Sequence, residues 1–413
     1  MFFTIILKIW SLIIQISDPF LILIRLKKGL ESPVRYKERY GVTDIRRPQG
    51  DLIWFHGASV GESLSILPLI QKITEHSPAT NFLLTTTTTA AQKVLNSRIN
   101  KNTIHQFVPF DAIQWVNKFL DHWQPKAVFF IESEIWPNIL WQTNLRNIPI
   151  TLLNARLSET SLINWLRVKK ISKKMWGCFS GIYTQSDLFT ERFHRLGAIN
   201  VKTVGNIKLL SEKLPFDEIE FAYWKTQMKD RLCWVAASTH EGEEEIIFKV
   251  HQALKKDLPN LLTIVVPRHV DRCEKIISKE NDVKISRFTE KNLRDEDILL
   301  VDAMSKLGIF YRLTAIAFIG GSLVPVGGHN PLEPVMLGAF PLWGPYFFNV
   351  NDMMYLFDSM QCQQKSVDQL IDTLRDFLKN PEKIKNLNDE LQQRVASSQQ
   401  LIDQKIDEIF MAI

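Results

Sequence analysis

Residues 52–62 read LIWFHGASVGE, an apolar run followed by a turn that contains glycine. Four apolar residues in a row, without alternation, are typical of a strand that is buried on both faces. Ser59 and Glu62 have the Ser-x-x-Glu spacing of a capping box, which predicts that a helix begins there. A buried strand that leads through a short turn into a helix is the building unit of a parallel α/β sheet.

The same alternation of apolar runs and helical stretches continues along the chain. The predicted strands are residues 52–55, 82–84, 104–107, 127–131, 150–153, 181–184 and 201–204, then 233–237, 262–266, 283–285, 298–301, 316–319 and 340–343. Residues 209–229 carry no strand pattern and separate the two series. Because this is too many strands for one sheet, we predict an α/β protein with two Rossmann-like, doubly wound domains, residues 31–208 and 209–413, after an N-terminal segment of residues 1–30. We expect ligands at the carboxyl ends of the strands and in a cleft between the domains.

The composition excludes several classes of protein. Of the 413 residues, 45% are hydrophobic and 23% are charged, and 17 Gly with 18 Pro are too few for a disordered chain. The four cysteines have no C-x-x-C spacing, which argues against a disulfide scaffold or a structural zinc site and fits a reducing compartment. The net charge of +5 is a weak bias for a protein whose main partner is nucleic acid, so we expect no nucleic-acid partner.

The N-terminal segment is apolar from residue 2 to residue 16. A helix of that length extends about 22 Å, which is short of the roughly 30 Å of a bilayer core. A basic run follows it directly. The polar exceptions, which share one stripe of a helix, are Thr4, Lys8, Ser11 and Gln15, and the basic run comprises Arg25, Lys27, Lys28, Arg35, Lys37 and Arg39.

Three interpretations of this segment compete. A secretory signal is disfavoured because no positive region precedes the apolar run and no small-residue cleavage site follows it. A buried core helix is the plain alternative. We expect a membrane-associated helix that lies in the surface or crosses it imperfectly, with the basic run held by anionic headgroups on the cytoplasmic side.

Two more strand-to-helix turns repeat the pattern of residues 52–62. Ser238 and Glu241 follow the strand 233–237, and Asn330 and Glu333 follow a glycine-rich loop, with Pro331 expected at the first helical position. Each pair by itself is explained by helix capping. The glycines that flank these turns let a ligand approach the backbone, however, and the N-terminus of a helix attracts phosphate.

Charged residues follow other strands of the two series. Arg268 ends a strand of the second half and could add a positive charge to a phosphate site. Glu132 and Glu134 follow a strand of the first half, where a carboxylate that faces an acceptor hydroxyl can act as a general base. The chain has no G-x-x-x-x-G-K-[ST] loop, which argues against a P-loop NTPase. The pattern suggests group transfer between two domains.

Seven segments together resemble the Kdo (3-deoxy-D-manno-octulosonic acid) transferases of lipopolysaccharide biosynthesis, which are inverting glycosyltransferases of the GT-B fold. Any one segment is weak alone, but they occur in the family's order across nearly the whole chain. The segments are HGASVGE (56–62), ESEIWPN (132–138), NARLS (154–158), GNIK (205–208), STHEGE (238–243), VPRH (266–269) and GGSLVPVGGHNPLE (320–333).

The resemblance implies transfer of Kdo from CMP-Kdo to the lipid A precursor lipid IVA at the cytoplasmic face of the inner membrane, with no metal and no other cofactor. It implies that Glu62 is the general base and that Glu132 and Lys208 stabilise the transition state. The residues that it implies for CMP binding are Pro267, Arg268, Ala303, Met304, Ser305, Asn330, Pro331, Leu332 and Glu333. One turn departs from the family pattern, because Ser305-Lys306 stands where Gly-Glu is usual.

Simpler interpretations stay open for single residues. Lys208 is also explained as a surface cation, and Arg156 either orients a substrate carboxylate or pairs with a neighbouring acid. Trp136 fits packing, and His56 and His329 fit hydrogen bonds within their loops. The competing functions are a GT-B enzyme for a UDP-sugar, such as another transferase or an epimerase, and a non-catalytic membrane-associated protein that binds lipid or nucleic acid through the basic run. No motif indicates the oligomeric state or the number of Kdo residues transferred.

Overall fold

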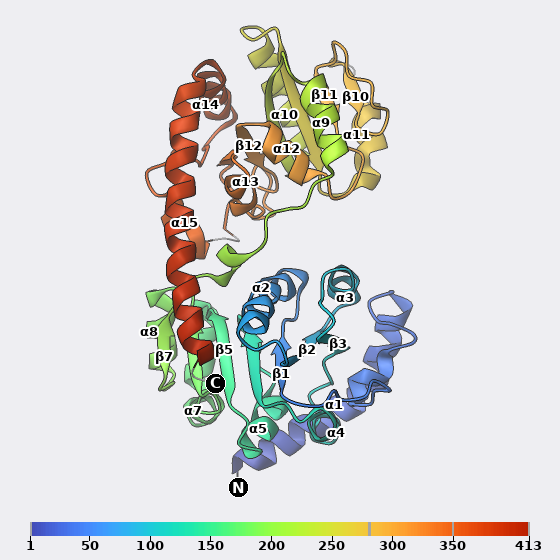
Figure 1. Cartoon of the computed structure of the whole chain (residues 1–413), viewed down its shortest axis with the longest axis vertical. Coiled ribbons are helices and arrows are strands. Elements are labelled where there is room, and N and C mark those ends of the chain that lie inside the picture. The colour runs from blue at the N-terminus through green and yellow to red at the C-terminus, as the bar shows by residue number, and fades with distance from the viewer. Residues whose placement is uncertain (1, 280–281, 349–350, 412–413) are drawn as a thin grey trace. The chain divides into compact units, whose positions relative to one another are not determined.

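The computed structural model describes residues 2–279, 282–348 and 351–411, and it divides into two compact units (Figure 1). Unit 1 contains residues 1–211 and 399–413, and unit 2 contains residues 212–398. The observed division at 211 lies close to the predicted one at 208, but residues 399–413, which we predicted in the second domain, cluster with unit 1. Met1 and residues 412–413 of the predicted ranges lie outside the described residues.

Specific contacts explain why the end of the chain belongs to unit 1. The last helix, α15 (Pro381–Met411), carries Phe410, whose ring packs edge-on against Phe129 with centroids 5.5 Å apart. The Lys405 ammonium donates to the Thr203 carbonyl at 2.9 Å. Since sequence separation says nothing about such contacts, the strand pattern alone could not assign these residues.

Unit 1 is built on one fully parallel sheet of order β3-β2-β1-β4-β5-β6-β7. Its strands are β1 (Leu52–His56), β2 (Asn81–Thr86), β3 (Thr103–Phe107), β4 (Ala127–Ile131), β5 (Ile150–Ala155), β6 (Gly181–Thr184) and β7 (Val201–Thr203). Its helices are α1 (Phe2–Lys27), α2 (Val60–His76), α3 (Thr89–Leu95), α4 (Ile113–Trp123), α5 (Pro137–Leu145), α6 (Glu159–Arg167), α7 (Lys169–Trp176) and α8 (Asp187–Arg195). Every residue of β1 and β4 is buried, as the continuous apolar runs predicted.

Unit 2 repeats this architecture with a parallel sheet of order β10-β11-β9-β8-β12-β13. Its strands are β8 (Leu232–Thr239), β9 (Leu261–Pro267), β10 (Ile285–Arg287), β11 (Ile298–Leu300), β12 (Ile316–Ile319) and β13 (Phe340–Trp343). Its helices are α9 (Glu218–Gln227), α10 (Glu243–Lys255), α11 (Cys273–Lys279), α12 (Leu307–Leu313), α13 (Leu332–Met336), α14 (Val367–Lys379) and most of α15. Each predicted strand overlaps an observed one, and β10 differs most because it begins where the predicted strand 283–285 ends.

Each sheet has a central pair of neighbouring strands from which the chain proceeds to opposite sides. In unit 1 this pair is β1 and β4, with the strands in chain order on both sides. In unit 2 it is β8 and β12, and there β11 lies between β9 and β10. The loops that leave such a pair diverge to opposite sides and open a crevice at the carboxyl edge, where doubly wound proteins bind their ligands. The topology therefore selects the loops after β1, β4, β8 and β12 for inspection.

One side of helix α1 packs on unit 1, and its exposed side is mostly apolar. Phe3 and Leu7 join the core of unit 1, and Ser11, from the predicted polar stripe, is buried and accepts a hydrogen bond from the Ile113 amide at 2.9 Å. The Trp10 indole donates to Asp111 at 2.9 Å. The exposed apolar side chains are Ile5, Ile9, Leu12, Ile13, Ile16, Phe20, Leu21, Leu23 and Ile24. No single described helix is long and apolar enough to cross a membrane, whereas residues 3–18 and 20–27, with a 45° bend between them, together have the length and composition to do so.

The basic run is divided between surface and interior, which corrects the expectation that the whole run faces headgroups. Arg39 is buried against the fully buried Glu31, and Arg25 pairs with the same carboxylate. Arg35 forms an ion pair with Glu38. Acids that are close in sequence thus hold the three arginines. The exposed members of the run are Lys27, Lys28 and Lys37.

Candidate active site

The reversal point of unit 1 gathers carboxylates at the carboxyl edge of the sheet. Glu62 lies in the first turn of α2, directly after β1, and Glu132 follows β4, the neighbour of β1. Glu132 is buried and adopts a left-handed backbone conformation with φ of 64°. That conformation is costly for a residue with a side chain and is usually kept where the surrounding structure requires it.

Glu62 is held by the turn that it caps, as the sequence predicted. Its carboxylate accepts from the Ala58 amide and from the Ser59 hydroxyl, each at 2.8 Å, and the Ser59 oxygen accepts from the Glu62 amide at 3.3 Å. Burial raises the pKa of Glu62, the Ser59 hydrogen bond opposes this shift, and the charges of Glu132 and Glu134 add to it. An oriented carboxylate with a raised pKa suits a general base.

Lys208 and Arg156 converge on Glu132. The Lys208 ammonium contacts one carboxylate oxygen, and the Arg156 Nε lies 2.8 Å from the other. The structure thus brings together the three predicted catalytic residues Glu62, Glu132 and Lys208. Of the two alternatives for Arg156, the structure shows the pairing with a neighbouring acid.

Two asparagine side chains hold the backbone of the segment that ends at Lys208. The Asn154 side chain accepts from the Ile207 amide at 3.0 Å, and the Asn206 side chain accepts from the Lys208 amide at 3.0 Å. Asn154 is buried and has φ of 55°, a conformation that asparagine tolerates better than most residues. The segments NARLS and GNIK therefore meet through hydrogen bonds that fix the lysine.

Glu134 belongs to a second, more structural set of contacts. It accepts from the Trp136 indole at 2.8 Å and lies 3.7 Å from the His56 Nε2, while the other ring nitrogen of His56 bonds Thr85. Burial would raise the pKa of Glu134, but the contacts with His56 and Trp136 outweigh it, so that the pKa is lowered. These contacts support the structural interpretation of His56 and Trp136.

In unit 2 one buried carboxylate organises the loops after β8 and β12. Glu243 is fully buried and accepts from four backbone amides, those of His240, Gly321, Ser322 and Leu323, at 2.6–3.0 Å. Four charge-assisted hydrogen bonds to one carboxylate lock both loops together. The glycine-rich loop is therefore closed by a side chain from the neighbouring helix.

The predicted capping box of Ser238 and Glu241 is wrong, because the N-cap of α10 is Gly242, four residues after Ser238. The helix begins at Glu243, and Glu241 is exposed and pairs with Lys275. Ser238 instead lies where the loops after β8 and β12 touch through their backbones, since a Cβ at Gly320 would lie 2.4 Å from the Ser238 carbonyl oxygen.

Two histidines stack beside this loop. The His240 and His329 rings are nearly parallel, and their Nε2 atoms lie 2.8 Å apart, which means that one ring donates to the other. Burial lowers the pKa of His329 to about 4, and the positive charges of His240 and Arg268 act in the same direction. His329 is therefore neutral at pH 7, and it bonds a side chain rather than the loop backbone.

The predicted CMP residues lie around the same edge of unit 2. Arg268 follows β9 and is exposed, and among the described residues its guanidinium has no hydrogen-bond or ion-pair partner. The Asn330 side chain accepts from the Leu332 amide at 3.0 Å, and burial raises the pKa of Glu333. Pro331 is the N-cap of α13 rather than its first helical residue.

The turn of Ala303, Met304 and Ser305 follows β11, the neighbour of β9. Ser305 has φ of 62°, the left-handed region that costs a serine about 1 kcal/mol and a glycine nothing. A glycine at this position would therefore relieve the strain. Lys306 pairs with Glu220, so this chain fixes the turn through α9 instead.

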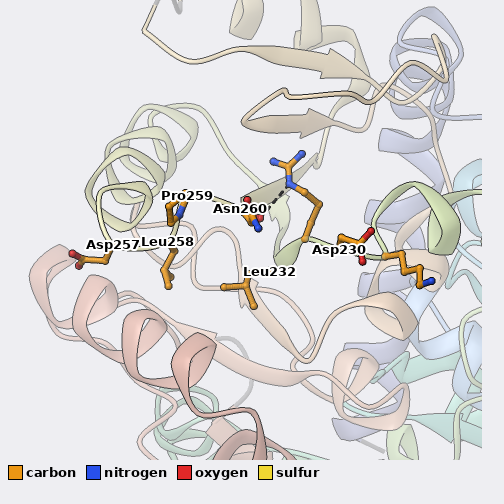
Figure 2. Close-up of a pocket in the computed structure, with 8 residues that line it drawn as sticks. Asp230, Leu232, Asp257, Leu258, Pro259 and Asn260 are labelled. Atoms are coloured by element: carbon orange, nitrogen blue, oxygen red, sulfur yellow. Dashed lines mark hydrogen bonds between the residues drawn. The ribbon is translucent and has the colours of Figure 1, made fainter.

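One described pocket lies away from both carboxyl edges. It has a volume of about 550 Å³ and is lined by residues 229–232 and 257–260, at the amino ends of β8 and β9 (Figure 2). Within this lining, the Arg231 side chain donates a hydrogen bond to the Asn260 carbonyl. Since ligands of parallel sheets bind at the opposite edge, this pocket is no candidate for the reaction. Among the described residues no cluster of three or more His, Cys, Asp or Glu could hold a metal ion.

Comparison with known proteins decides the family. Residues 34–211 match the sequence profile of the family described as 3-deoxy-D-manno-octulosonic-acid transferase (kdotransferase). A 3-deoxy-D-manno-octulosonic acid transferase of Rickettsia bellii is 32% identical over 392 residues, which are 93% of this chain and 93% of that protein. This chain belongs to the Kdo transferase family. The Haemophilus influenzae enzyme of the same name is 34% identical to this Kdo transferase over 81% of each chain.

Solved structures confirm the predicted GT-B fold. The UDP-GlcNAc 2-epimerase from Neisseria meningitidis, bound to UDP-GlcNAc, aligns with a TM-score of 0.58 over 87% of this chain and 100% of that chain. At 11% identity the likeness shows the fold alone. Since epimerases share this fold with transferases, the transferase assignment rests on the sequence relatives.

Two residues of the site were not recognised as site residues from the sequence. Glu243 stands in STHEGE, but the spacing of Glu241 from Ser238 matched the capping pattern better. Arg156 was left out of the catalytic set because no spacing rule connects it to Glu132. In both cases the partner comes from a different strand of the sheet, so only the three-dimensional pairing identifies it.

Replacing Glu243 tests whether its hydrogen bonds hold the loops after β8 and β12 together. In Glu243→Ala four buried amides lose their acceptor, and each costs about 1–3 kcal/mol if it stays unpaired. We expect the free energy of unfolding of unit 2 in urea to fall by at least about 3 kcal/mol, with faster hydrogen exchange at residues 320–323. The matched control is Glu241→Ala, which removes an exposed ion pair worth less than about 1 kcal/mol. Equal losses in both variants would contradict the assignment.

Proposed function

We propose that this Kdo transferase is an inverting enzyme that moves Kdo from CMP-Kdo to lipid IVA, without a metal ion or another cofactor, at the cytoplasmic face of the inner membrane. The observation that carries the proposal is the oriented carboxylate of Glu62 beside the ion-paired Glu132 and Lys208. Membership of the Kdo transferase family identifies the transferred sugar as Kdo. The acceptor, the stereochemistry and the role of the base are the proposed parts.

In the proposed step an acceptor hydroxyl oxygen bonds to the anomeric carbon of Kdo while the bond from that carbon to the CMP phosphate breaks. The hydroxyl proton passes to Glu62, and the electron pair of the broken bond stays on CMP. Attack from the side opposite CMP inverts the configuration. Lys208, held by Glu132, offers the positive charge of unit 1 to the transition state.

Unit 2 offers the features that a nucleotide monophosphate requires. Arg268 presents an exposed guanidinium, and Asn330 to Glu333 form the turn that leads into α13. An arginine can bind phosphate oxygens with two parallel N–H groups. We assign donor binding to this edge and acceptor activation to the edge of unit 1.

Replacing the base gives the most direct test. In Glu62→Gln the side chain keeps its shape but cannot take a proton, so we expect kcat to fall at least about 100-fold with CMP-Kdo and lipid IVA, measured by mass spectrometry of the lipid. The control Glu75→Gln, on the exposed side of the same helix, should keep its kcat. Because the neighbouring charge of Glu134 raises the pKa of Glu62, Glu134→Gln should move the acidic limb of the kcat profile to lower pH. Wild-type turnover in Glu62→Gln would remove Glu62 from its role.

The nucleotide distinguishes this function from its rivals. CMP should raise the melting temperature of the wild-type protein, and UMP or UDP at the same concentration should not, because a ligand stabilises only the fold that it binds. At 100 times its Kd, CMP would add about 2.7 kcal/mol. Arg268→Ala should reduce this shift. Preferential protection by UDP would favour an enzyme for a UDP-sugar, and no protection by any nucleotide would favour a non-catalytic lipid-binding protein.

We infer that α1 attaches the enzyme to the membrane by lying in its surface. One side of the helix packs on unit 1 through Phe3, Leu7 and Ile22, which leaves only the opposite side for lipid. That side is apolar, and it is followed by the exposed Lys27 and Lys28, which suit an anionic surface.

Substitution of the outward face tests this attachment. In the double variant Ile13→Ser, Ile16→Ser two half-exposed apolar side chains are lost without any change in the buried face. We expect at least about a 10-fold weaker binding to phosphatidylglycerol vesicles in a flotation assay, because each isoleucine contributes up to about 1.5–3 kcal/mol when buried in lipid. Ile199→Ser, an exposed position elsewhere on unit 1, is the control. Unchanged flotation of the double variant would contradict the inference.

A further inference from the structure

The run of five threonines at residues 85–89 has one member whose contacts reach the base. Thr85 bonds His56, and Thr88 caps α3. Thr87 has a different role. Its hydroxyl donates to the Ala58 carbonyl at 2.7 Å, and its amide approaches the same oxygen at 3.4 Å. Ala58 is the residue whose amide donates to Glu62.

On its other side Thr87 is held by two arginines. Its carbonyl accepts from Arg39 at 2.7 Å and from Arg25 at 3.1 Å. Both guanidinium groups also contact the buried carboxylate of Glu31, each at 3.1 Å. One carbonyl thus receives charge-assisted hydrogen bonds from two different parts of the chain, and such bonds are about twice as strong as neutral ones.

The two arginines differ in their surroundings. Arg39 is buried and lies over the Phe107 ring at 4.8 Å, so its position is fixed by packing. Arg25 belongs to the last turn of α1 and is one-third exposed, so its position depends on how that helix is seated. A continuous series of hydrogen bonds therefore connects the end of α1, through Thr87 and Ala58, to Glu62.

This connection bears on the orientation of the base. If Thr87 is displaced, the Ala58 carbonyl loses both of its hydrogen bonds to Thr87, and residue 58 can shift so that its amide moves away from Glu62. The loss of a hydrogen bond to the ionised form raises the pKa of a carboxyl group. The charged groups that face this carboxyl, Glu132 and Glu134 with Lys208 and Arg156 on Glu132, would then act on a less restrained side chain.

We propose that Arg25 and Arg39 are positioning residues for Glu62, which act through Thr87 and Ala58, so that the seating of α1 contributes to turnover as well as to attachment. The inference rests on the proposed role of Glu62 as the base. A purely structural role of these residues would lower the stability of unit 1 but would leave the pH dependence of kcat unchanged.

The test compares variants in detergent-dispersed lipid IVA, where attachment to a bilayer does not matter. Thr87→Val removes the hydroxyl at nearly constant volume, and Arg25→Gln removes the link to α1. We expect both to lower kcat at least about 10-fold, to leave KM for CMP-Kdo within about 2-fold, and to move the acidic limb of the kcat profile to higher pH. The matched controls are Thr87→Ser, which keeps the hydroxyl, and Arg98→Gln, which removes an exposed arginine elsewhere on unit 1; both should behave like the wild type.

Arg39→Gln is unsuited as a sole test because it leaves Glu31 buried without one of its partners, and the variant can fail to fold. The proposal is overturned if Thr87→Val and Thr87→Ser have equal kcat profiles, or if Arg25→Gln does not differ from Arg98→Gln.

A second readout does not depend on turnover. The pKa of Glu62 is followed by NMR of protein with ¹³C-labelled glutamate carboxyl groups, and the signal is assigned by its loss in Glu62→Gln. The proposal expects a higher pKa in Arg25→Gln and Thr87→Val than in the wild type, and an unchanged pKa overturns it. If the wild type transfers no Kdo but the pKa moves, the proposed reaction fails while the positioning contact stands.

Discussion

The site depends on one kind of interaction, a carboxylate that accepts the backbone amides of the turn between a buried strand and the following helix. After β1 this carboxylate belongs to Glu62, and after β8 it belongs to Glu243. The first four amides of a helix and the amides of a tight turn have no partners within their own element, and leaving them buried without an acceptor is costly. A carboxylate at this position therefore stabilises the turn and is held in place by it.

The two units use this interaction to different ends. Both carboxylate oxygens of Glu243 accept hydrogen bonds, from four amides in all, and the side chain is fully buried. It therefore has no free acceptor for a substrate. Glu62 accepts one amide and one hydroxyl, and its pKa is raised by burial and by neighbouring acids. The same local motif thus yields a fixed scaffold in unit 2 and a candidate base in unit 1. The difference comes from the neighbouring strand, because β12 brings a glycine-rich loop to Glu243, whereas β4 brings Glu132 to Glu62.

The side chains of the basic run, residues 25–39, fall into two groups that its composition does not separate. Its lysines stay at the surface, where a charge costs little and can meet an anionic partner. Two of its arginines, Arg25 and Arg39, share the Glu31 carboxylate and the Thr87 carbonyl. A guanidinium offers five N–H groups in a planar fork and can satisfy two acceptors at once, which an ammonium does less well. The division between Lys and Arg in this segment therefore follows from the number of acceptors that each must serve.

The local elements could be predicted from the sequence: the strands, the turn that Glu62 caps, and the two parallel sheets that such units must form. Those features depend on contacts within a few residues, which periodicity and spacing report directly. The ordered motifs also indicated the family, and the relatives confirmed it. Only the tertiary structure decided that α10 begins at Glu243, that Arg156 pairs with Glu132, that Arg39 is buried, and that residues 399–413 return to unit 1. Each of these depends on which strand or helix lies beside another. That neighbour is chosen by the packing of the whole sheet, so no short stretch of sequence contains it.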